Sequence, residues 1–170
     1  TTIQALNPAI KIIAPWRFWD LHSREELIEY AKSHNIPINQ STEKIYSRDE
    51  NIWHISHEGG ELENPWNEHY DTIHVLSVPP EKAPDKPEYV DIDFESGVPV
   101  GINGEKMGPI EILEKLNEMG SRNGVGTIDI IENRLVGMKS RGVYETPGGT
   151  ILFAAHAGLE QLILDRDTTQ

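Results

Sequence analysis

Two segments of this 170-residue chain mix polar and apolar side chains in a way that suits a binding surface. The first covers residues 46–59, where the hydroxyls of Ser47 and Ser56 and several carboxylates lie among isoleucine and tryptophan residues. The apolar neighbours indicate partial burial, and buried polar groups need hydrogen-bond partners in the protein or on a ligand. A structural explanation stays open and is favoured by spacing alone, because Ser47 also fits the N-cap of a short helix and Ser56 an ordinary strand serine.

The second segment covers residues 131–150, and Glu132 stands near its start at the end of an apolar run. A carboxylate in that position is costly to desolvate unless a cation or several donors meet it. One possibility is a structural ion network with Arg134, Lys139 or Arg141. The other is that Glu132 receives the ammonium group of a small ligand, and residue types alone leave both open.

The residue patterns needed for metal binding, phosphate binding or nucleophilic catalysis are missing or badly placed. Among the seven histidines, His54 and His57 with Glu58 form the best group, but strand positions 54 and 57 face opposite sides, so no metal site is predicted. The sequence has no phosphate-binding loop, no Gly-x-Ser-x-Gly elbow and no cysteine. No catalytic nucleophile or general base is therefore predicted in this chain.

Composition limits the classes of binding partner and the cellular compartment that fit this chain. With 15 basic and 28 acidic residues the net charge is −13, which argues against nucleic acid and anionic membranes as partners. No apolar run approaches the roughly 18 residues that span a bilayer, and the first residues lack the charged and apolar regions of a signal peptide. A cytoplasmic protein is predicted. The first residue is Thr1 rather than methionine, which fits a piece of a longer protein.

The elements that must position these residues begin with one strand and one helix. The β-branched run 9–14, closed by Pro15, predicts a buried strand. Ser23 and Glu26 have the spacing of a capping box, which predicts a helix that ends near Asn35. One strand and one helix are too little for a domain. Residues 1–36 are therefore predicted to be the end of an α/β domain.

A second domain is predicted for the rest of the chain, residues 37–170. After a proline-rich connector over 78–87, apolar and acidic residues alternate over 89–95, and two turns flank a strand over 98–102. This pattern predicts an antiparallel meander, with Pro99 placing its strand at a sheet edge.

Helices and further strands follow the meander. The spacing predicts a helix from Pro109 that stops at Gly120, a strand over 126–132, a short strand over 134–138 and a helix over 147–163. The predicted fold class is α+β, with an antiparallel β meander and packed helices behind a short αβ remnant.

Several strings of this sequence closely resemble argininosuccinate synthase. They include Ser-x-Asp-Glu-Asn-x-x-His-Ile-Ser at 47–56 and an unbroken match from Val136 to Thr150. The other matching strings lie at residues 5–8 with 14–17, 62–65, and 124–126 with 129–134. Because the matches occur in order over most of the chain, the resemblance is specific.

The resemblance implies a ligase of arginine biosynthesis and the urea cycle that joins citrulline to aspartate using ATP with Mg²⁺. In this family the citrulline ureido oxygen attacks the α-phosphate, pyrophosphate leaves, and the aspartate amine displaces AMP from the citrullyl-adenylate. The family's Ser-Gly-Gly-Leu-Asp ATP loop and its aspartate-binding residues do not occur here. By resemblance, residues 1–36 end the nucleotide-binding domain, residues 37–170 form most of the synthetase domain, and the full enzyme is a homotetramer.

The resemblance also assigns a substrate site. Ser47, Ser56, Glu132 and Tyr144 fall on the family's citrulline-binding residues, and Glu58 is a further candidate for the same pocket. A carboxylate suits an ammonium group, and hydroxyls can donate to a carboxylate or accept from NH groups. The alternative function is a non-catalytic binding or oligomerisation module that kept the fold without the activity.

Overall fold

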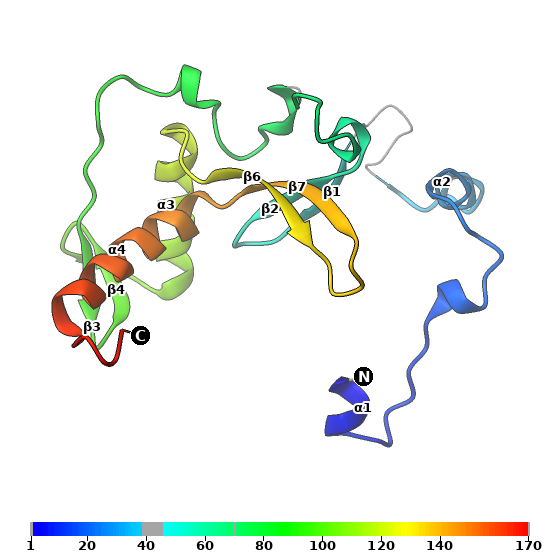
Figure 1. Ribbon diagram of the computed structural model, residues 1–170, viewed down its shortest axis with the longest axis horizontal. Helices are drawn as coiled ribbons and strands as arrows, with labels where there is room; N and C mark the ends of the chain where they lie inside the picture. Colours follow the sequence, from blue (N-terminus) through cyan, green and yellow to red (C-terminus); the bar gives the residue numbers. More distant parts are fainter. Residues whose placement is uncertain (1, 39–45, 70, 170) are drawn as a thin grey trace. The chain divides into compact units, whose positions relative to one another are not determined.

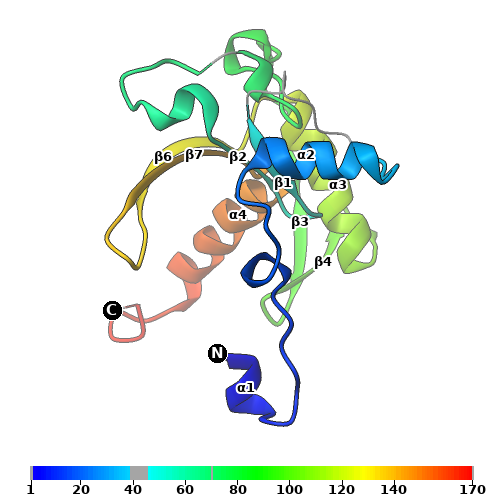
Figure 2. The ribbon, with the colours of Figure 1, turned by 90° about the vertical axis from the view of Figure 1, so that its right-hand side faces the viewer.

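The structure is a computed structural model that describes residues 2–38, 46–69 and 71–169. The chain divides into two compact units, Thr1–Lys44 and Ile45–Gln170. Figures 1 and 2 show short helices in the first unit and sheets with two long helices in the second. No helix among the described residues is long and apolar enough to cross a bilayer.

The first unit is helical. It contains α1 (Thr2–Leu6), the 3-10 helix η1 (Pro15–Arg17) and α2 (Arg24–Ser33). The capping box predicted for α2 is confirmed, since the Ser23 hydroxyl accepts from the Glu26 amide and the Glu26 carboxylate accepts from the Ser23 amide, both at 3.1 Å.

The strand predicted over residues 9–14 is wrong for this chain, because that segment forms no strand. A strand needs a hydrogen-bonded neighbour. Among residues 2–38 the structure forms no second strand that could supply one. The isoleucines of the run are accordingly open to solvent, with Ile12 44% and Ile13 70% exposed.

The second unit contains a four-stranded antiparallel sheet. Its strands are β1 (Ser47–Glu50), β2 (Ile55–Glu58), β6 (Thr127–Asn133) and β7 (Lys139–Glu145). Their order is β1-β2-β7-β6, so β2 and β7, far apart in sequence, lie side by side in the middle. The helix N-cap interpretation of Ser47 is therefore wrong, because Ser47 is the first residue of β1.

A three-stranded antiparallel sheet follows, made of β3 (Ile92–Glu95), β4 (Val98–Ile102) and β5 (Glu105–Lys106). The prediction that Pro99 marks an edge strand is wrong, because β4 is the middle strand. Pro99 is tolerated because it pairs only with Phe94 of β3, whereas β5 pairs with the last two residues of β4.

Two helices, α3 (Pro109–Arg122) and α4 (Pro147–Ile163), pack against each other. The predicted stop at Gly120 is wrong, since α3 continues to Arg122. A Cβ added at Gly120 would lie 2.8 Å from the Pro147 Cβ, so this glycine permits the close approach of α4 instead. The α+β class with packed helices is confirmed.

The strand predicted over residues 134–138 is also wrong, because these residues form the turn that joins β6 to β7. The Arg134 amide donates to the Met138 carbonyl at 2.8 Å, and Gly137 adopts a positive φ of 84°. A glycine suits that conformation because it has no Cβ. Strand β7 consequently starts later than predicted and carries Tyr144.

Between β2 and β3 the described residues, 59–69 and 71–91, form no strand; they contain the 3-10 turns η2 (Gly60–Glu63), η3 (Asp71–Ile73) and η4 (Pro80–Lys82). Two separate clusters of buried hydrophobic residues lie in the described part of this unit. One joins this connection to the four-stranded sheet through Tyr46, Leu62, Ile73 and Val143. The other lies between the three-stranded sheet and α3 and contains Ile102, Ile112, Leu116 and Met119.

Candidate functional site

The register of the four-stranded sheet places all four predicted citrulline residues on one face. Ser56 stands opposite Tyr144 on β7, and Tyr144 stands opposite Ile128 on β6. Ser47 on β1 and Glu132 on β6 lie an even number of positions from that row, so their side chains leave the same face. We call this surface the polar face; its members are Ser47, Asp49, Ser56, Glu58, Glu132, Ser140, Gly142 and Tyr144, together with Ile128 and Ile130 of β6.

The opposite face of the same strands is the one that the core covers. Ile55 and Val143 are buried there, and so are the polar residues His57 and Glu145. A one-residue register shift would exchange the two faces. Burial of this apolar set therefore fixes which residues the polar face presents to a ligand.

Tyr144 and Glu132 interact across the polar face. Burial and then the neighbouring Glu132 carboxylate raise the pKa of Tyr144 to about 12. The phenol is therefore protonated at neutral pH, with its hydroxyl group beside Glu132. The His54 ring stacks beside Tyr144 with the two centroids 6.1 Å apart.

The cations considered as partners for Glu132 contact other groups. Arg134 Nη2 lies 3.3 Å from Glu58 Oε2 and donates to Ser140 Oγ at 3.1 Å. Lys139 donates to the side-chain oxygen of Asn133, and Arg141 pairs with Asp129 at 2.7 Å. The structural ion network is thus built around Glu58 and Asp129, while Glu132 interacts with Tyr144.

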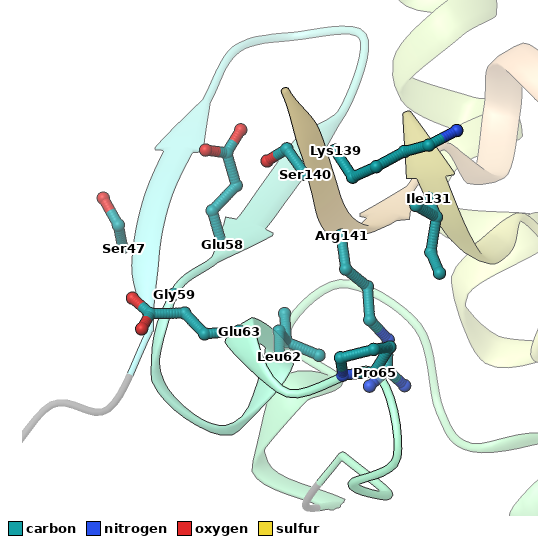
Figure 3. A pocket seen from close by; sticks show the side chains of 10 residues that line it. All are labelled: Ser47, Glu58, Gly59, Leu62, Glu63, Pro65, Ile131, Lys139, Ser140 and Arg141. Atoms are coloured by element: carbon teal, nitrogen blue, oxygen red, sulfur yellow. The ribbon is translucent and has the colours of Figure 1, made fainter. Parts of the chain in front are cut away.

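A cavity of about 780 Å³ opens at the end of β2. Figure 3 shows the Ser140 hydroxyl directed toward the Glu58 carboxylate, with Ser47 apart on strand β1 and Arg141 directed toward Pro65. Of the candidate residues, Ser47 and Glu58 line this cavity. Ser56, Glu132 and Tyr144 share the polar face but are not among the lining residues, which are Ser47, Glu58, Gly59, Leu62, Glu63, Pro65, Ile131, Lys139, Ser140 and Arg141.

Sequence reasoning missed Ser140 and the bridging role of Arg134. Ser140 lies directly opposite Glu132 and four residues before Tyr144, so it shares their face. An alternating pattern over 139–145 could have revealed it if the turn had been placed at residues 134–138. The contact of Arg134 with Glu58 joins positions 76 residues apart and has no local signal.

One buried carboxylate fixes the connection between β2 and β3 to the sheet. Glu145 is fully buried and accepts from His57 Nε2 at 2.8 Å and from the amides of Val75, Leu76 and Ser77 at 2.8–3.2 Å. We call this arrangement the Glu145 cluster. Burial alone raises the pKa of the Glu145 carboxyl, but the bonds from His57, Ser77 and Val75 bring it below its ordinary value.

The Glu145 cluster also accounts for His57, one of the two histidines considered as metal ligands. Arg48 Nε donates to His57 Nδ1 at 3.0 Å, which assigns the ring proton to Nε2, where it is donated to Glu145. Across the described part of the chain, no three histidine or carboxylate side chains gather as a metal-binding group.

Comparisons with known proteins agree with this architecture. Residues 46–170 match the family model described as the arginosuccinate synthase C-terminal domain. The argininosuccinate synthase of Alkaliphilus metalliredigens is 68% identical over 168 residues, which are 99% of this chain and 41% of that protein. Those of Acetivibrio thermocellus and Roseiflexus sp. are 65% and 59% identical, over 98% of this chain and 42% and 41% of those proteins.

The chain spans about two fifths of the length of the curated relatives that it matches. The family model nevertheless covers the whole four-stranded sheet, both long helices and every residue of the polar face. The chain belongs to the argininosuccinate synthase family.

Proposed function

We propose that this chain supplies the citrulline-binding side of an enzyme that condenses citrulline and aspartate at the expense of ATP. The reaction gives argininosuccinate, AMP and pyrophosphate through a citrullyl-adenylate. The observation that carries the proposal is the register that brings Ser47, Ser56, Glu132 and Tyr144 to one face. The family membership of the chain supplies the reaction.

Each of these residues has a role that suits an amino-acid ligand. The Glu132 carboxylate interacts with Tyr144 and has further acceptor sites for the citrulline ammonium group. The hydroxyl of Ser47 is exposed, and that of Ser56 makes only a long 3.4 Å bond to the Asp49 carbonyl, so both can turn toward a ligand. Held at these points, the ureido oxygen is oriented for attack on phosphorus.

The polar face does not fit the phosphates of ATP. It carries the carboxylates of Asp49, Glu58 and Glu132 against the single guanidinium of Arg134, and such a surface repels a polyanion. We therefore propose that ATP with Mg²⁺ is bound mainly by a nucleotide-binding domain of which residues 1–36 are the end. Residues 37–170 are the synthetase domain of a cytoplasmic homotetramer.

The alternative is a binding or oligomerisation module without catalytic function. A module released from citrulline binding would have no use for Glu132 and Tyr144 interacting beside two serine hydroxyls that can turn toward a ligand. The two functions differ in one measurable property, which is whether substitutions on the polar face change the requirement for citrulline.

Serine substitutions provide that test. In a synthase of full family length that carries this segment, Ser47→Ala and Ser56→Ala are each expected to raise the citrulline KM by about three- to tenfold, because each removes one hydrogen bond. The KM for ATP should stay unchanged. Ser121→Ala on α3 is the matched control, and unchanged citrulline KM values in both variants would favour the non-catalytic module.

The chain on its own is expected to be inactive. Incubated with citrulline, ATP and Mg²⁺, residues 1–170 should release no pyrophosphate, since the polar face does not fit a triphosphate. A coupled pyrophosphate assay with the full-length enzyme as the positive control measures this. ATP-dependent turnover by the isolated chain would contradict the placement of the ATP site outside it.

A further inference from the structure

Gly142 occupies the middle of the polar face, in the row between Glu58 of β2 and Ile130 of β6. Its φ is not in the left-handed region, so the backbone does not call for glycine. Alanine would be preferred there, because a glycine inside a strand costs stability. The explanation must therefore lie in the space above it.

That space is filled by Tyr144. A Cβ added at Gly142 would lie 3.0 Å from both Cε2 and the hydroxyl oxygen of Tyr144, and 3.2 Å from Cζ. Contacts this short require the ring to move by a few tenths of an ångström. The tyrosine ring thus lies along its own strand, over the glycine two residues before it.

The orientation of the ring matters because Glu132 is remote along the sheet. Tyr144 is paired with Ile128, whereas Glu132 lies four residues further along β6, about 13 Å at the usual strand rise. A side chain standing upright from the sheet, as strand side chains usually do, would not come near it. Because the ring lies along β7 over Gly142, the Tyr144 hydroxyl is carried toward Glu132.

We propose that Gly142 is a positioning residue for substrate binding: by leaving the polar face empty it lets Tyr144 lie flat and hold the Glu132 carboxylate for the ligand ammonium group. This role rests on the proposed citrulline site. Gly142, which has no side chain, would then be needed to orient Tyr144 and Glu132, which touch the ligand. Glu132 is then fixed in place before citrulline arrives.

The test is a double-mutant cycle between Gly142→Ala and Tyr144→Phe in a synthase of full family length. Each single substitution is expected to raise the citrulline KM about tenfold, because each removes the Tyr144 hydroxyl from its place beside Glu132, with the ATP KM unchanged. The double variant should be no worse than Tyr144→Phe alone, because that hydroxyl can be lost only once.

Two results would separate the possible failures. If Tyr144→Phe raises the citrulline KM but Gly142→Ala does not, or if the two effects multiply, the role of Gly142 is overturned while the citrulline site stands. If Tyr144→Phe and Glu132→Gln both leave the citrulline KM unchanged, the citrulline site itself is overturned, and the role of Gly142 with it.

Thermal unfolding gives a readout that does not depend on activity. With Tyr144 replaced by alanine, the ring no longer covers position 142, and adding Gly142→Ala should raise the Tm. In the presence of Tyr144 the same glycine substitution should lower it. The same sign in both backgrounds would overturn the packing on which the proposal depends.

Discussion

Replacing Glu132 by glutamine is expected to raise the citrulline KM of the full-length enzyme by about ten- to a hundredfold, the worth of one hydrogen bond to a charged group. The glutamine amide keeps the size and shape of the side chain but has no charge for an ammonium group. It also still offers an oxygen to the Tyr144 hydroxyl. The KM for ATP should change little, because the polar face does not fit phosphates.

Steady-state kinetics with citrulline and ATP varied in turn measure this effect. Glu114→Gln, an exposed glutamate on α3, is the matched control because it makes the same chemical change away from the polar face. Citrulline kinetics that Glu132→Gln leaves unaltered would rule out Glu132 as the ammonium partner.

The largest expected loss of stability follows from Glu145→Ala. This change leaves His57 and the amides of Val75, Leu76 and Ser77 without their shared acceptor. Removing one partner of a buried charged network costs about 3–5 kcal/mol in the free energy of unfolding. Glu145→Gln should cost less, since an amide oxygen can still accept from the backbone. Urea denaturation measures both variants.

The same carboxylate makes stability depend on pH in a defined direction. The hydrogen bonds lower the pKa of Glu145 in the folded chain below its ordinary value of 4.5, so the folded state favours the charged form. Its contribution is complete above pH 4.5 and is lost as the pH falls through the lower folded pKa. The free energy of unfolding should therefore decrease more steeply with acid in the wild type than in Glu145→Gln. Parallel pH curves for the two proteins would contradict this role.

Local features of the fold could be predicted from the sequence. The start of α2 follows from Ser23 and Glu26, which bond to each other over three residues, and α4 follows from its apolar periodicity. Features that depend on distant neighbours could not. Gly120 resembles a helix stop until Pro147 is seen against it, and the run 9–14 resembles a strand although no partner strand forms beside it.

In the candidate site, too, the residues could be predicted from the sequence but their arrangement, which depends on distant neighbours, could not. Resemblance supplied Ser47, Ser56, Glu132 and Tyr144, but their common face depends on the pairing of β2 with β7, across 84 or more residues of chain. Their identity as citrulline ligands stays a prediction. Spacing alone favoured a helix cap for Ser47 because the strand residues 47–50 are all polar and show no alternation.

The Glu145 cluster has a consequence for how the connection between β2 and β3 behaves in solution. An irregular segment usually exchanges its amide protons with solvent quickly. The amides of Val75, Leu76 and Ser77 instead point at a carboxylate that is itself fully buried. We expect those protons to exchange when the carboxylate is withdrawn from the sheet. The segment should therefore open together with the four-stranded sheet and unfold as part of the core, although it is irregular.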